Sequence, residues 1–165
     1  MKIVRITLFA VGAGLLVAQV FRPEKNNSSG VGPRGFEQQF AVSSGVREIL
    51  LNSCYDCHSN KTRYPWYVGI QPVGWWLSGH IEDGKDELNF DEFGTYRPRR
   101  QFVKFREIEK MIVEEEMPLP SYAFVHRDAI LSEEQKGLVI DWSRAMRDSM
   151  EMRYPPDSLA RRLIQ

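Results

Sequence analysis

The chain has 165 residues, of which 42% are hydrophobic and 27% are charged, and its formal net charge at pH 7 is zero. This length suits one compact domain, and the balanced charge gives no electrostatic footprint for binding nucleic acid. The sequence contains no nucleophile–base pair and no phosphate-binding loop, so it does not support hydrolysis or nucleotide chemistry.

The N-terminal residues 1–21 have the pattern of an export signal. Lys2 and Arg5 precede an apolar run whose length lies between that of a signal peptide and a membrane span of about 20 residues. The segment Ala18–Val20 is a poor match to a cleavage site, which favours an uncleaved signal anchor over a removed signal peptide. We therefore expect the rest of the chain on the periplasmic side of a bacterial inner membrane, anchored to that membrane.

Composition divides the remainder of the chain into three parts. Residues 22–40 are rich in Gly, Pro, Asn and Ser, which predicts a flexible linker. Apolar residues at helical spacing then predict one folded domain over residues 41–150. Residues 151–165 are expected to form a peripheral tail.

The first helix of this domain is expected to lead directly into a cysteine motif. It begins at Ser43 or Ser44, because either hydroxyl can cap the free N–H groups of the first turn. Its apolar face is formed by residues at helical spacing, namely Val42, Val46, Ile49 and Leu50. The last turn of the helix can therefore present the pentapeptide Cys54–His58 to a ligand.

This pentapeptide has the form Cys-x-x-Cys-His, which is typical of a c-type haem attachment site. The thiols of Cys54 and Cys57 can each form a thioether with one haem vinyl group, and His58 can then bind the iron. Half of a zinc site, a redox-active dithiol and a disulfide are the alternative interpretations of the cysteine pair. Haem attachment is favoured because the histidine follows directly, because the chain has no further cysteine for a zinc site, and because export leads to the compartment where haem is attached.

Three further helices are expected after the motif. The first of them has Pro72 in its first turn and His80 on its apolar stripe. Pro98 starts the next. The last begins at Ser132, which forms a capping box with Gln135, and its apolar face is expected to pack across the first helix. The predicted fold is therefore all-α.

The second axial ligand of such a haem has several candidates. Met117 is favoured, because Pro118 and Pro120 end the preceding helix and hold this methionine in a stiff loop. His80 and His126 are the alternative protein ligands, and an open or water-bound iron is the remaining possibility.

The order of a helix, the cysteine motif, an aromatic loop, a Met-Pro loop and a capped final helix resembles a class I c-type cytochrome. Narrower similarity lies in the segments Cys54–Asn60, Thr62, Tyr64–Tyr67, Pro72–Leu77, His80-Ile81, Leu88–Phe90 and Met117–Leu119. Through these segments the chain resembles the bacterial haem-binding domain family of small exported proteins, over about residues 45–145. The resemblance implies a helical domain around a covalent haem c held by Cys54 and Cys57. It also implies that His58 and Met117 bind the iron.

These features predict a monohaem electron carrier of the cell envelope, rather than an enzyme, that exchanges electrons with redox partner proteins. Two axial positions filled by protein would let the iron change charge with little rearrangement and would exclude substrates. The alternative is a haem enzyme or small-molecule sensor, such as a peroxidase-like domain, with an open distal position. A third interpretation is a fragment of a larger respiratory assembly.

Overall fold

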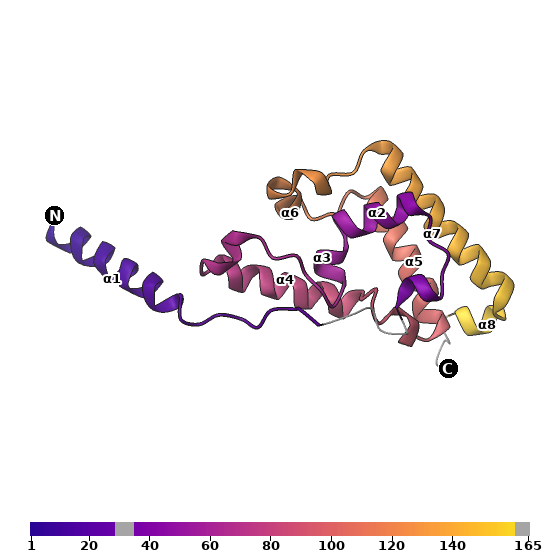
Figure 1. Ribbon diagram of the computed structural model, residues 1–165, viewed down its shortest axis with the longest axis horizontal. Helices are drawn as coiled ribbons and strands as arrows, with labels where there is room; N and C mark the ends of the chain where they lie inside the picture. Colours follow the sequence, from indigo (N-terminus) through magenta and orange to yellow (C-terminus); the bar gives the residue numbers. More distant parts are fainter. Residues whose placement is uncertain (29–34, 161–165) are drawn as a thin grey trace.

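The computed structural model describes residues 1–28 and 35–160, and this part of the chain is helical and contains no sheet (Figure 1). Its eight α-helices are α1 (Lys2–Ala18), α2 (Ser44–Ser53), α3 (Tyr55–His58), α4 (Val73–Glu87), α5 (Pro98–Val113), α6 (Pro120–Val125), α7 (Glu133–Arg153) and α8 (Pro156–Leu159). Four short 3₁₀ helices connect them, η1 (Phe36–Gln38), η2 (Trp66–Gly69), η3 (Phe93–Thr95) and η4 (Arg127–Ala129). The all-α prediction is confirmed.

Helix α1 forms in the segment that has the export-signal pattern, and it extends away from the rest of the molecule (Figure 1). None of its residues is buried, so α1 contributes nothing to the core. Among the described residues, no helix combines the length and the hydropathy needed to cross a membrane.

The predicted helix starts agree closely with the structure. The hydroxyl of Ser43 accepts a hydrogen bond from the backbone N–H of Val46 and so caps α2. Ser132 and Gln135 form the reciprocal capping box at the start of α7. Helix α4 begins at Val73, one residue later than predicted, because Pro72 occupies the cap position instead of the first helical turn.

An aromatic cluster forms the centre of the core, where α7 packs against both α2 and α5. The ring of Phe36 lies at its middle, with centroid distances of 5.0–5.9 Å to its five aromatic neighbours, Phe40, Phe90, Phe93, Phe105 and Trp142. Most of these ring pairs meet edge to face, the arrangement that the charge distribution of aromatic rings favours. Much of the aromatic content of the chain is therefore used for packing.

Part of the predicted linker and part of the predicted tail belong to the folded domain. Phe36, within residues 22–40, is completely buried in the aromatic cluster, and residues 26–28 pair with residues 60–62 through backbone hydrogen bonds. Leu159, within the expected tail, is buried in the core. Residues 29–34 and 161–165 lie outside the described part of the chain.

Helices α3 and α4 approach each other very closely at one point. A Cβ atom placed on Gly84 of α4 would lie 2.9 Å from the carbonyl oxygen of Cys57 and 3.2 Å from its Cβ. The carbonyl belongs to the backbone of α3 and cannot move aside as a flexible side chain would. Glycine at this position therefore sets the distance between the cysteine motif and α4.

Replacing Gly84 by Ala should lower the free energy of unfolding by about 1–3 kcal/mol, the usual cost of overpacking a close contact. The matched control is Gly79→Ala, in the same helix, where an added Cβ meets nothing within 4 Å. The control should be neutral or stabilising by up to about 1 kcal/mol, since alanine favours helix more than glycine does. Urea unfolding of both variants measures the difference, and equal stabilities would contradict the close contact.

Candidate haem site

The cysteine motif forms a sharp helical corner. Helix α2 ends at Ser53, and the backbone of Cys54 departs from helical geometry with φ −127° and ψ −44° before the single turn of α3 begins. Within that turn, the backbone N–H groups of Cys57 and His58 both donate to the carbonyl oxygen of Cys54, at 3.2 and 3.0 Å. The corner therefore holds the two thiols and the imidazole on one turn.

The residues of this turn line a cavity of about 180 Å³ whose surface is almost wholly apolar. Cys54, Cys57 and His58 form one part of its lining, and Met117 and His80 come to it from other elements. A second cavity of about 220 Å³ adjoins it. The two share the residues Cys57, His80, Leu119 and Tyr122. Together they form an extended apolar hollow of the kind that a large flat ligand needs.

The imidazole of His58 is fixed by the C-terminal end of α4. Its Nδ1 atom lies 2.8 Å from the carbonyl oxygen of Gly84 and 3.0 Å from that of Leu88. Both partners are acceptors, so Nδ1 carries the proton and donates, and the lone pair is left on Nε2. Burial lowers the pKa of His58, which keeps the ring neutral. A neutral imidazole whose Nδ1–H is bonded to protein is the arrangement of a metal-ligating histidine.

The two thiols are free, and burial favours their protonated form. Burial raises the pKa of Cys54 to about 12, with a further contribution from Cys57. Burial likewise raises the pKa of Cys57 to about 11, with a contribution from the carboxylate of Asp56. A redox-active dithiol needs a thiolate with a lowered pKa, and its expected βαβ surroundings are missing from the described residues. The dithiol interpretation of the motif is therefore not supported.

The zinc interpretation of the cysteine pair finds no further ligands either. A structural zinc site uses four protein ligands. In residues 1–28 and 35–160, no group of three or more His, Cys, Asp or Glu side chains is arranged to hold a metal ion. The side chains of Cys54, Cys57, His58 and Met117, which line the cavity together with His80, are groups that fit haem attachment and ligation.

Two of the three candidates for the second axial ligand reach the cavity. Met117 lies on the loop between α5 and α6, where its backbone N–H donates to the carbonyl oxygen of Met111 at 3.2 Å. His80 reaches the cavity from α4, with Nδ1 2.9 Å from the carbonyl oxygen of Trp76. His126 does not line either cavity; its ring stacks on Tyr122 at a centroid distance of 4.2 Å.

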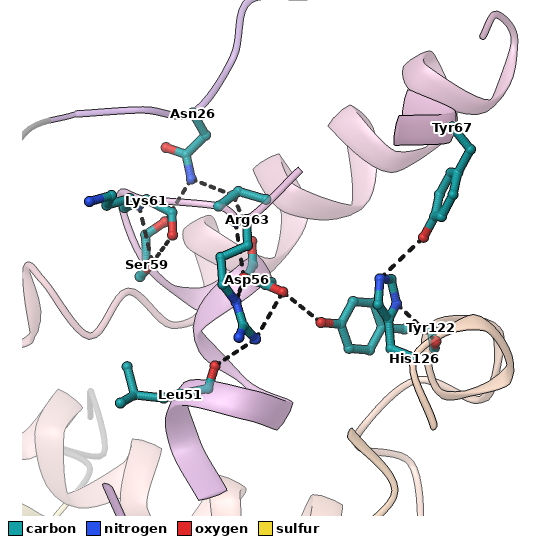
Figure 2. A network of polar contacts seen from close by, with 10 residues as sticks. Asn26, Leu51, Asp56, Ser59, Lys61, Arg63, Tyr67, Tyr122 and His126 are labelled. Carbon is teal, nitrogen blue, oxygen red and sulfur yellow. Dashed lines mark hydrogen bonds and ion pairs between the residues drawn. The ribbon is translucent and has the colours of Figure 1, made fainter. Parts of the chain in front are cut away.

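A buried carboxylate inside the cysteine motif was not singled out from the sequence. Asp56 is only 7% exposed, and its Oδ2 atom accepts a hydrogen bond of 2.7 Å from the hydroxyl of Tyr122 (Figure 2). Its Oδ1 atom accepts from the backbone N–H and the Nε atom of Arg63, at 3.0 and 3.1 Å. The carboxylate is thus paired and hydrogen-bonded, as a buried charge must be.

This network joins three separate segments of the chain around the cavity. Tyr122 lies on α6, shortly after Met117, and Arg63 lies on the loop that follows the motif. Arg63 also donates to the carbonyl oxygen of Leu51 in α2 (Figure 2). Burial, followed by the hydrogen bond to Asp56, raises the pKa of Tyr122, so its hydroxyl remains a donor. The turn that carries the thiols is therefore tied to the segment that carries Met117.

Sequence reasoning missed this network because its members are far apart in the chain. Asp56 and Tyr122 are separated by 66 positions. No helical or alternating pattern links them. The only local signal was an acidic residue between two cysteines at the end of an apolar helix, where a carboxylate needs a partner if it is buried.

Residues 13–145 match the haem-binding domain family. The match covers most of the chain, so this protein belongs to the haem-binding domain family. Comparisons with curated proteins and with solved structures give no match. The recognition made from the sequence motifs is confirmed.

Replacing Tyr122 by Phe should lower the free energy of unfolding by about 1.5–3 kcal/mol, because it removes a hydrogen bond to a buried carboxylate. The control is Tyr67→Phe, which removes a longer contact of 3.3 Å between the Tyr67 hydroxyl and Nε2 of His126. Its cost should be no more than about 1 kcal/mol. Urea titrations of the two variants compare these effects. If the Tyr122 variant is no less stable than the control, the hydroxyl does not secure Asp56.

Proposed function

We propose that this protein carries one covalent haem c, attached through thioethers to Cys54 and Cys57, with His58 as proximal ligand and Met117 as distal ligand. The observation that carries the proposal is the convergence of these four side chains on one apolar cavity. The bonds from Nδ1 of His58 to two backbone carbonyls support it further, because they leave Nε2 available to a metal.

The position of Met117 favours it over His80 as the distal ligand. The Nδ1 side of His58 faces the C-terminal carbonyls of α4, so this helix lies behind the ring, on the side away from Nε2. His80 lies on the same helix, whereas Met117 comes from the loop before α6. A distal ligand must approach the face opposite His58, and the hydrogen bond from Tyr122 to Asp56, which ties α6 to the cysteine turn, supports an approach from the loop that carries Met117.

The role we propose is electron transfer in the cell envelope. Haem supplies an iron that changes between the ferric and ferrous states, and axial ligands determine its potential and its access to small molecules. With His58 and Met117 both bound, no position on the iron would be open to a substrate. The chain's own contribution is to fix the imidazole through α4 and the methionine through the α6 segment.

A second candidate role is that of a haem enzyme or small-molecule sensor with an open distal position. The observation that favours it is the place of His80, which lines both cavities. Its Nδ1 atom is bonded to the carbonyl oxygen of Trp76, which leaves Nε2 free to act on a ligand in the hollow. In this alternative Met117 would be an apolar part of the wall.

We also propose that the protein works on the periplasmic side of a bacterial inner membrane, with α1 inserted in that membrane, and exchanges electrons with redox partner proteins. The basic residues Lys2 and Arg5 followed by an apolar helix with no buried residue support this location. Beyond Arg5 the helix carries no charged side chain and packs on no protein core, so lipid could cover its apolar surface even though it is shorter than a full membrane span.

Spectra of the haem-loaded protein distinguish the two roles. The ferrous protein should be low-spin and should not bind carbon monoxide, because Met117 occupies the sixth position. Met117→Ala should bind carbon monoxide, lose the sulfur–iron absorption band of the ferric state, and shift to a lower reduction potential. Rapid carbon monoxide binding by the unsubstituted protein would contradict the electron-transfer role and favour the enzyme or sensor.

The matched control for this experiment is His80→Ala, which removes the other candidate ligand of the same cavity. It should leave the spin state and the carbon monoxide response unchanged. If the spectrum changes in His80→Ala and not in Met117→Ala, the distal ligand is His80.

A further inference from the structure

One end of the domain is uncharged although the chain as a whole is rich in charge. Residues 64–81 contain no Asp, Glu, Lys or Arg, whereas such residues make up 27% of the sequence. They form the loop before η2, η2 itself and the first half of α4. We call residues 65–76 the uncharged tip.

The uncharged tip exposes large apolar side chains. Trp66 is 83% exposed, and the exposed hydrophobic residues of the tip also include Ile70, Val73, Trp75 and Trp76. The surfaces of soluble proteins rarely expose so many bulky apolar side chains in one short segment, and such clusters mark interaction sites. Tryptophan in particular has an apolar ring system with one polar N–H, which suits a boundary between an apolar and an aqueous phase.

The uncharged tip is hydrogen-bonded to the end of α1. The side chain of Gln19 accepts from the backbone N–H of Gln71 at 2.9 Å and donates to the carbonyl oxygen of the same residue at 3.1 Å. The indole N–H of Trp75 donates to the carbonyl oxygen of Phe21 at 2.6 Å. In Figure 1 the start of α4 is the end of the domain nearest α1.

The segment that these bonds hold is itself apolar. No charged residue lies between Arg5 and Arg22, and none of the residues of α1 is buried. The apolar surface of α1 is thus continuous with the uncharged tip, and whatever covers the end of α1 must also lie against the tip.

We propose that the uncharged tip is a membrane-contacting surface, seated in the headgroup region of the same bilayer that receives α1. This proposal rests on the proposed membrane insertion of α1. It goes further by stating which end of the domain faces the lipid. Indole rings at the boundary between headgroups and acyl chains stabilise such a position. Because residues 64–81 contain no charged side chain, no charge has to be desolvated when this segment enters the headgroup region.

This orientation places one end of the apolar hollow at the membrane. The second cavity is lined by Val73 and Trp76 of the uncharged tip and, one turn further along α4, by His80. The hollow then runs from the tip to the first cavity, where His58 is held by the C-terminal end of the same helix.

Fluorine NMR of the full haem-loaded chain tests the orientation, with fluorotryptophan in place of its four tryptophans and the iron kept ferrous. The protein is bound to phosphatidylcholine–phosphatidylglycerol vesicles that contain a lipid with a nitroxide on its headgroup. The signals of Trp66 and Trp75 should lose intensity. The signal of Trp142, buried in the core and bonded to the carbonyl oxygen of Ala41, should not. Single Trp→Phe substitutions assign the signals.

The test variant is Trp66→Asp, which places a charge in the tip without disturbing the core. Its matched control is Met152→Asp, since Met152 is equally exposed, at 84%, but lies near the end of α7. The loss of the Trp75 signal should be smaller in Trp66→Asp and unchanged in Met152→Asp.

Three outcomes would overturn the proposal. Equal or absent signal loss for Trp66, Trp75 and Trp142 in vesicle-bound protein would contradict the orientation alone. If the protein forms a dimer in detergent that Trp66→Asp abolishes, and if the vesicle nitroxide leaves the tryptophan signals unchanged, the tip binds a protein partner instead. Failure of the protein to bind vesicles would overturn both the orientation and the insertion of α1. The covalent haem is measured separately by absorbance, and its loss would contradict the haem proposal without affecting the orientation.

Discussion

The Nδ1 atom of His58 is hydrogen-bonded to the last carbonyl groups of α4, and the rest of the site depends on this contact. The carbonyls of Gly84 and Leu88 accept from its Nδ1 atom, and the close approach at Gly84 lets α4 come near enough to provide them. The carbonyl oxygen of His58 accepts from the N–H of Phe90, whose own carbonyl accepts from Phe36 at the centre of the core. The ring is therefore positioned by α4 and anchored, through its backbone, to the most densely packed part of the molecule.

A second constraint acts from inside the cysteine motif. The buried carboxylate of Asp56 cannot be left without partners, and it finds them in Arg63 and Tyr122, which come from different segments. Burying this charge costs free energy that a purely apolar corner would not require. In return, the cysteine turn and the segment after Met117 are held in one geometry. The proposed arrangement, with His58 and Met117 on opposite faces of a haem, would need this kind of fixed spacing.

Features that depend on neighbouring residues could be predicted from the sequence, whereas features that depend on contacts between distant residues could not. Ser43 and Ser132 cap helices as expected, because capping depends on residues a few positions away. The all-α fold and the family also followed from periodicity and from the motif. Phe36, by contrast, lies in a stretch with the composition of a linker, and its burial depends on partners as far away as Trp142. Asp56 gave no periodic signal. The sequence left the second axial position open among Met117, His80, His126 and a water-bound iron. The folded chain brings Met117 and His80 to the cavity and leaves His126 outside it.

The central claim is that Cys54 and Cys57 hold one haem covalently, and intact-mass spectrometry under denaturing conditions tests it most directly. The protein is produced with a haem-attachment system and unfolded in acid, which releases any haem that is held only by its iron ligands. The account predicts a single species heavier than the polypeptide by one haem, and no such species when both cysteines are replaced by serine. A polypeptide mass without haem, from protein that was coloured before unfolding, would show that haem binds without covalent attachment and would contradict the account.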